Sequence, residues 1–149
     1  MKALEEKIKR TTLLIKTRKA QLDREAGQLA EIKRSKIAQL KSLDSHQKSY
    51  IDGVNRLNVE RQTSDRKLLM TLERGVDHSK SQWYRCLREV KQFEEQEKQQ
   101  IKQVLEAQRQ LRSLEIIQEG YLQAMKKESA RKDQKELDEV SLSKYVSRS

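Results

Sequence analysis

The chain has 149 residues, of which 34% are hydrophobic and 38% charged, and its formal net charge is +10. Ordinary globular domains contain roughly 45–50% apolar residues, so this composition argues against a compact core of several layers. The chain has no proline and four glycines, the two residue types that most disfavour helix interiors. The composition therefore predicts an all-α protein built from very long helices. Disorder of the whole chain is the alternative, because high charge and low hydrophobicity also mark unfolded chains.

Several features of the sequence indicate the cellular compartment in which the protein acts. The apolar runs are far shorter than the roughly 20 residues that cross a bilayer. Glu5 and Glu6 stand where a signal peptide has its apolar stretch. Cys86 is the single cysteine, so a disulfide framework is impossible and a reducing compartment fits best. These features predict a cytoplasmic protein.

Periodic apolar residues predict a first helix over about residues 3–57. Steps of three and four place side chains on one helical face, as the seam of a coiled coil requires. A strict seven-residue step opens the pattern, and the stripe is then expected to shift. Its members are Ile8, Ile15, Leu22 and Leu29, followed by Ile32, Leu40, Leu43, Tyr50, Val54 and Leu57.

The segment from Asn58 to Asp65 interrupts this period. It ends in Thr63, Ser64 and Asp65, residue types that cap helix N-termini by accepting backbone N–H bonds. We therefore expect a turn at about residues 58–64, a second helix over about residues 65–140 and a frayed tail over 141–149. The second apolar stripe comprises Leu69, Leu72, Val76, Trp83, Cys86, Val90, Phe93, Ile101, Val104, Leu111, Leu114 and Ile117.

Together these elements predict a single coiled-coil domain over 1–149, folded as a long two-helix antiparallel hairpin. A fold at the expected turn sets Tyr50 level with Leu72, and Ile8 level with Leu114. By the same pairing Leu22 lies level with Gln100 and Ile101. Past about residue 119 the second helix then overhangs the first, and an uncovered helix either frays or docks on another molecule. The apolar residues left without an internal surface are Leu122, Met125, Leu137 and Val140.

Candidate catalytic and metal-binding groups are sparse. His78 and Cys86 are eight residues apart, roughly 12 Å along a helix, which is too far for a nucleophile and its base. Two histidines and one cysteine do not make a metal-ligand cluster, and there is no glycine-rich phosphate loop. We therefore expect no enzymatic activity, catalytic residue, metal site or cofactor, and a packed structural role for Cys86.

The net charge suggests an acidic partner. Residues 1–41 hold twelve Lys and Arg against five Asp and Glu. A solvated coiled-coil surface is the plainer explanation. A protein that binds nucleic acid or anionic membrane is a third possibility, and its binding should fall steeply with salt. The basic run at 126–132 is interrupted by Glu128 and has no interleaved aromatic residue, so no nucleic acid is expected.

Three segments, 39–50, 71–76 and 133–139, resemble the FliJ family of flagellar export proteins in sequence and in order. The resemblance covers about residues 39–142, whereas the N-terminal part is similar only in helical character. It implies a cytoplasmic stalk, at the inner-membrane export apparatus, that enters the export ATPase hexamer and promotes its assembly. It also implies contact with the export gate protein FlhA, through its cytoplasmic domain, and with export chaperones, while membrane contact comes only through partners. The alternatives are a generic coiled-coil tether or chaperone, and the equivalent stalk of a virulence injectisome.

The resemblance also implies two sets of binding residues. The family's gate-binding positions correspond to Gln39, Leu43, His46 and Tyr50 in the first helix, and to Leu68, Leu72 and Gly75 in the second. This sequence departs from the family's pattern at His46, where tyrosine is usual, and at Leu68, where phenylalanine occurs. An exposed Tyr50 would contribute to gate binding and little to stability, whereas a seam role for Leu43, Tyr50 and Leu72 is the alternative.

The second set lies on the overhang, which we expect to enter the ATPase ring. Its basic side chains could meet acidic groups that line the ring and steer the approach electrostatically. The expected ATPase-binding residues are Leu122, Met125, Lys126, Lys127, Arg131, Lys132 and Lys135.

Overall fold

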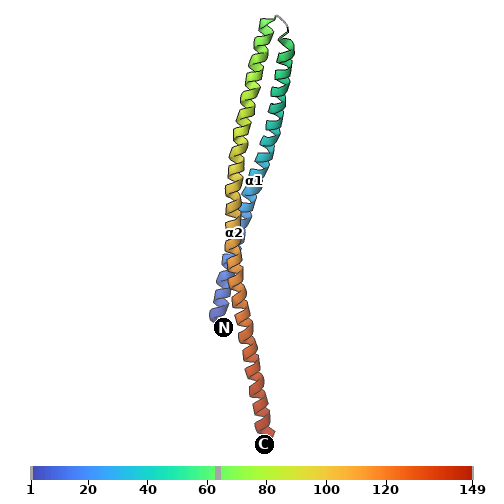
Figure 1. Ribbon diagram of the computed structural model, residues 1–149. Coiled ribbons are helices and arrows are strands. Elements are labelled where there is room, and N and C mark those ends of the chain that lie inside the picture. The colour runs from blue at the N-terminus through green and yellow to red at the C-terminus, as the bar shows by residue number, and fades with distance from the viewer. Residues whose placement is uncertain (1, 63–64, 149) are drawn as a thin grey trace. The chain divides into compact units, whose positions relative to one another are not determined.

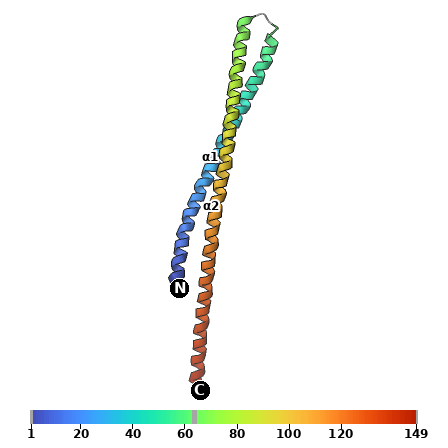
Figure 2. The ribbon, with the colours of Figure 1, turned by 60° about the vertical axis from the view of Figure 1, so that its left-hand side comes forward.

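The computed structural model describes residues 2–62 and 65–148, which form helix α1 (Lys2–Glu60) and helix α2 (Arg66–Arg148) joined by a turn. From the turn the two helices run back side by side in opposite directions (Figures 1 and 2). The described residues contain no β-strand. The predicted all-α two-helix antiparallel hairpin is therefore confirmed.

The turn is shorter than expected, because α1 continues through Glu60 rather than ending near residue 57. The backbone N–H of Arg61 still donates to the carbonyl of Leu57 at 2.9 Å, which extends the last helical turn. At the other side of the turn, Asp65 caps α2. Its Oδ1 accepts hydrogen bonds from the backbone N–H groups of Lys67, at 3.1 Å, and Leu68, at 3.3 Å. Capping by Asp65 is thus as predicted, while Thr63 and Ser64 lie outside the described residues.

The expectation of a frayed tail over 141–149 is wrong, since α2 stays helical through Arg148. No proline or glycine follows Gly120, so the sequence contains no strong helix breaker there. Near the end, the Ser147 hydroxyl donates to the carbonyl of Lys144 at 3.0 Å. The last residue, 149, is outside the described part of the chain.

Contacts divide the chain into two units. Unit 1 comprises Met1–Arg24 and Leu105–Ser149, and unit 2 comprises Glu25–Val104. Each unit contains a stretch of α1 packed against a stretch of α2, and both helices continue from one unit into the other.

The seam of α1 is one unbroken heptad repeat, with core positions a and d alternately four and three residues apart. The expected shift of the stripe is therefore wrong: Lys36 keeps the register, and Leu40 lies outside the seam with 41% of its surface exposed. All seam residues of α1 are buried or half-buried. They are Ile8, Ile15, Leu22, Leu29, Lys36, Leu43, Tyr50 and Leu57 at a, and Leu4, Thr11, Arg18, Glu25, Ile32, Gln39, His46, Gly53 and Glu60 at d.

Helix α2 carries the matching repeat without interruption. Cys86, Val90, Ala107 and Leu111 are its most buried members, so the predicted packed thiol of Cys86 is confirmed. The seam residues are Leu69, Val76, Trp83, Val90, Glu97, Val104, Leu111, Gln118 and Met125 at a, and Leu72, Ser79, Cys86, Phe93, Gln100, Ala107, Leu114 and Tyr121 at d.

Polar side chains in the seam pair across it. In unit 2, Lys36 Nζ and Glu97 Oε2 form an ion pair at 3.2 Å, and the Gln100 amide donates to the carbonyl of Glu25 at 2.9 Å. In unit 1, Arg18 donates to the Oε1 of Gln110 at 2.7 Å. No buried side-chain nitrogen or oxygen of the described residues lacks a partner. The seam therefore accepts polar groups without the penalty of leaving them unpaired.

The residues that lie opposite each other in the two helices differ from the predicted pairs by a shift of roughly one heptad along α2. Tyr50 packs against Trp83 rather than lying level with Leu72, and Gly53 faces Val76. In unit 1, Lys7 lies over the ring of Tyr121, so the predicted level of Ile8 with Leu114 is also wrong. The continuation of α1 through Glu60 explains the direction of the change, because it moves the point of reversal toward Asp65.

Glycine substitutions test this packing. A Cβ atom at Gly27 or Gly120 would meet no atom within 4 Å, whereas one at Gly53 would lie 3.2 Å from Val76 Cγ2. We expect Gly27→Ala and Gly120→Ala each to raise the free energy of unfolding by up to about 1 kcal/mol, because alanine favours the helix. Gly53→Ala should give a smaller gain or a loss in urea denaturation. An equal gain at all three sites would contradict close packing at Gly53.

Candidate protein-binding surfaces

The residues that correspond to gate-binding positions lie mostly between the helices of unit 2. Gln39, Leu43, His46 and Tyr50 occupy consecutive seam positions of α1 and are half-buried. Leu68 and Leu72 of α2 are also half-buried, while Gly75 is exposed with open space around it. The structure thus brings the two sets to one unit but places them in and beside the seam. What a partner can reach there is the outer edge of these side chains.

Tyr50 is the clearest case. Its ring stacks on that of Trp83 with centroids 5.4 Å apart and planes inclined by 30°. Trp83 in turn stacks on Tyr84, again at 5.4 Å, and Lys80 lies over the Tyr84 ring at 5.7 Å. The expectation that the Tyr50 ring is exposed is therefore wrong, because the sequence pattern did not reveal this interhelical stack. Its small effect on stability remains a prediction, which the stack argues against.

The C-terminal segment, residues 126–148 of α2, is the largest uncovered stretch of helix in unit 1. The side chains of 126–147 are all exposed, and the hydrogen bonds identified there, from Gln134 to Asp138 and from Ser147 to Lys144, are local. Figures 1 and 2 show this segment continuing beyond the N-terminal stretch of α1. Among the described side chains, those of residues 126–147 are therefore not covered by the rest of unit 1.

The overhang begins later than predicted. Tyr121 is half-buried beneath Lys7, and Met125 is half-buried at the last seam position of α2. Met125 is therefore wrongly placed among the uncovered residues, since α1 extends to Lys2 and the pairing is shifted along α2. Leu122, Leu137 and Val140 are exposed, as expected.

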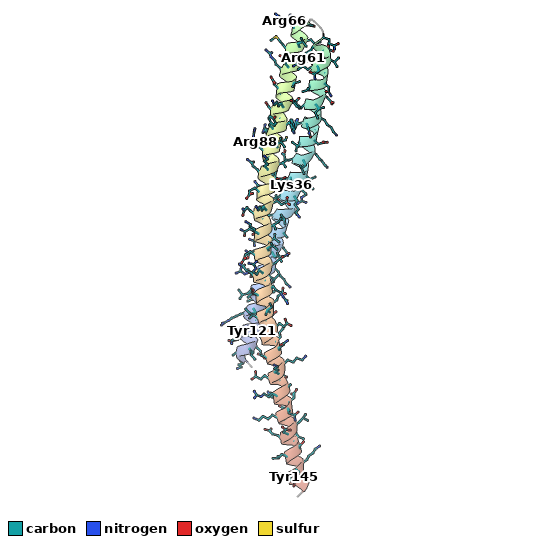
Figure 3. All side chains as sticks on the ribbon, viewed as in Figure 1. Lys36, Arg61, Arg66, Arg88, Tyr121 and Tyr145 are labelled. Carbon is teal, nitrogen blue, oxygen red and sulfur yellow. The ribbon has the colours of Figure 1, made fainter. Side chains whose placement is uncertain are left out.

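The C-terminal segment displays both kinds of residue expected of a contact surface. Its predicted basic members are exposed and take part in no identified ion pair within the described chain; they are Lys126, Lys127, Arg131, Lys132 and Lys135. Further apolar residues, missed because this part was expected to fray, are Leu142, Tyr145 and Val146. Tyr145, labelled in Figure 3, is 77% exposed. These residues belong to the surface because α2 stays helical through Arg148.

In the described ranges 2–62 and 65–148, no three His, Cys, Asp or Glu side chains are grouped so that they could hold a metal ion. No helix within those ranges is long and apolar enough to span a membrane.

Comparison with known protein families gives one match over nearly the whole chain. The family model for the flagellar FliJ protein matches residues 7–149. Comparisons with curated proteins and with solved structures give no match. The family match includes the N-terminal residues that resembled the family only in helical character.

Replacement of Tyr50 tests the aromatic stack. We expect Tyr50→Ala to lower the free energy of unfolding by about 2 kcal/mol, because it removes a half-buried ring and its stacking partner contact. Tyr50→Phe keeps the stack and should cost much less. Tyr145→Ala is the matched control, since that ring is exposed. Chemical denaturation of the three variants provides the measurement, and equal stability of Tyr50→Ala and Tyr145→Ala would contradict a structural role.

Proposed function

The chain belongs to the FliJ family of flagellar proteins, and from that premise we propose that it is a non-enzymatic stalk and adaptor of the flagellar type III protein export apparatus. Membership of this family makes it a flagellar, export-related protein. In the proposed role the chain inserts into the export ATPase ring, promotes ring assembly, and links the ring to the gate protein FlhA and to export chaperones. It would act in the cytoplasm, at the inner-membrane export apparatus.

The observation that carries this proposal is the uncovered C-terminal segment. A helix alone in water gains little from exposed leucine, valine and tyrosine side chains, so their burial has to come from another molecule. Leu137 and Val140 are 62% and 53% exposed. The basic residues between 126 and 135 would bring the segment to an acidic lining and increase the association rate. A long narrow helix is a suitable shape for the central opening of a ring.

Gate binding would use a different part of the molecule. The residues that correspond to the family's gate-binding positions all lie in unit 2, between 39 and 75, whereas the C-terminal segment belongs to unit 1. One chain could therefore hold the ATPase and the gate protein at the same time. The action is that of an adaptor, in which binding at two surfaces brings two partners together.

Removal of residues 126–149 tests the ATPase contact. We expect the truncated hairpin to keep its unfolding transition, because the hydrogen bonds identified in this segment are local. Stimulation of the export ATPase and assembly of its ring should be lost, while FlhA binding persists. ATP hydrolysis, ring formation by electron microscopy and FlhA titration are the measurements. A truncated protein that stimulates the ATPase fully would place this contact elsewhere.

Glycine variants test the gate contact without disturbing the seam. Gly75 and Gly27 are both exposed helical residues with nothing within 4 Å of a built Cβ. Gly75→Gln and Gly27→Gln should both preserve or raise stability, because glutamine favours helix over glycine. If the surface at Gly75 contacts FlhA, only Gly75→Gln should weaken that binding, by about tenfold. Equal affinity of the two variants for FlhA in a titration would remove Gly75 from the interface.

A further inference from the structure

Unit 2 has one side of its helix pair that is much more apolar than the other. Seven large hydrophobic residues of this unit are exposed: Ile37, Leu40, Ile51, Val59, Met70, Tyr84 and Ile101. Single exposed apolar residues are normal on protein surfaces. Here, however, all of them except Val59 fall at heptad positions b or e. Each residue advances about 100° around the helix, so positions b and e both lie on the flank next to a.

Contacts in the structure place the b and e positions of both helices on one side. Tyr50 and Trp83 both occupy a positions and stack on each other, and Trp83 stacks on Tyr84 at position b. The a positions of α1 and α2 therefore lie on the same side of the helix pair. Tyr84, at position b, lies on that side as well. On the opposite side, Ile32 at d and Gln96 and Gln103 at g line one shallow hollow. We call the first side the b/e face.

The two sides differ in chemistry as well as in position. Positions g and c of unit 2 hold a series of uncharged polar residues: Gln28, Ser35, Ser42, Ser45, Ser49, Thr71, Gln82, Gln92, Gln96, Gln99 and Gln103. The b/e face has its apolar centre between two interhelical contacts, Lys36 with Glu97 and Tyr50 with Trp83. Between these layers lie Ile37 and Leu40 of α1 and Tyr84 and Leu87 of α2.

The borders of this face are basic. The f positions, which adjoin b on the outside of each helix, include seven basic residues and one acidic residue, Glu95, within unit 2. All seven are exposed, and Lys48 is the one for which an ion pair is identified in the described chain. They are Arg34, Lys41, Lys48, Lys67, Arg74, Arg88 and Lys102; Arg88 is labelled on α2 in Figure 3. Positive and negative side chains on the b/e face itself nearly balance in number. The basic borders therefore make the net charge of this side positive.

We propose that the b/e face of unit 2 binds an amphipathic helix of a partner protein whose apolar stripe is bordered by Asp and Glu, as a third helix alongside α1 and α2. An apolar stripe between two helices is a recurrent site for such a helix, which anchors at positions three and four residues apart. The span from Ile37 to Ile51 corresponds to about 21 Å of helix, or four turns.

A second copy of this chain fits the face less well. Two b/e faces brought together would set one basic border against another, and like charges at an interface disfavour association. An acid-bordered helix has the complementary pattern. This site goes beyond the proposed export function, because its exposed apolar residues are neither those that correspond to gate-binding positions nor part of the C-terminal segment.

A synthetic helix tests the proposal directly. The probe is a fluorescent 28-residue peptide of about four heptads with Leu at a and d and Glu at e and g, and its counterpart has Lys in place of Glu. The full chain should bind the Glu peptide in anisotropy titrations and bind the Lys peptide at least about tenfold more weakly. Absence of binding, or equal binding of the two peptides, would overturn the proposal.

Variants then locate the binding. Ile37→Gln with Leu40→Gln should weaken binding of the Glu peptide at least about tenfold, whereas Ser42→Gln with Ser45→Gln on the opposite side should not. Lys41→Glu with Arg88→Glu should reduce the preference for the Glu peptide. All six residues are exposed, so the unfolding transition should stay close to that of the unchanged chain. Equal losses on both sides would refute the assigned face.

Sedimentation equilibrium of the chain alone distinguishes the other occupant. We expect no self-association that depends on this face. A dimer that dissociates in Ile37→Gln with Leu40→Gln but persists in Ser42→Gln with Ser45→Gln would show that a second copy covers the face, and would overturn the proposal. Because neither measurement involves export components, failure here leaves the proposed function standing, and the reverse also holds.

Discussion

Contact between the a and d positions of two antiparallel helices is the interaction on which this structure depends. The seam is narrow, and in α1 most of its apolar residues stand at a, while polar residues or glycine occupy most d positions. Apolar burial on folding is therefore modest, in agreement with a chain that is 34% hydrophobic. The most buried side chains, among them Ile15, Leu57, Val90 and Leu111, supply the tightest packing.

Polar pairs in the seam impose register as much as they add stability. Ion pairs in partly exposed sites contribute little, and the side chains of Lys36 and Glu97 keep 26% and 20% of their surface exposed. A slip by one heptad would nevertheless separate Lys36 from Glu97 and Glu25 from Gln100, leaving charged and amide groups facing apolar neighbours. That penalty favours one alignment of the helices, as a polar residue at a core position does in other coiled coils.

A two-helix seam leaves most of each helix surface free, and the free surfaces differ from one another. Within the described part of the chain, the C-terminal segment has no covering helix, and it mixes basic and apolar residues. The b/e face of unit 2 has an apolar centre with basic borders, while the opposite side is rich in serine and glutamine. An adaptor requires several distinct binding surfaces on one scaffold. Two continuous helices provide such surfaces because few of their residues are buried in the seam.

The binding residues suggested by family resemblance also have a structural role. Gln39, Leu43, His46 and Tyr50 are seam residues, so a substitution there alters packing before it alters a partner contact. Loss of binding in Tyr50→Ala would thus be ambiguous, because Tyr50 stacks on Trp83. Gly75 is free of this ambiguity, since no internal neighbour surrounds it.

The amino-acid sequence by itself determined the helical class, the hairpin, the cap at Asp65 and the burial of Cys86. Each depends on local chemistry: the absence of proline, a period of seven, an aspartate before a helix and an apolar position in that period. Family resemblance was also visible in three short segments. The helical end at Arg148 was within reach too, because nothing after Gly120 breaks a helix.

The pairing of the helices was decided only in the tertiary structure. A heptad pattern looks the same after a shift of seven residues, so apolar periodicity could not distinguish Trp83 from Leu72 as the neighbour of Tyr50. Lys36 interrupts the apolar stripe because it is charged, and the residue that pairs with it across the seam, Glu97, is distant in sequence. Two further features depend on that pairing. The overhang starts after Met125, and exposed apolar residues gather on one side of unit 2, because of which residues of α1 lie opposite which residues of α2.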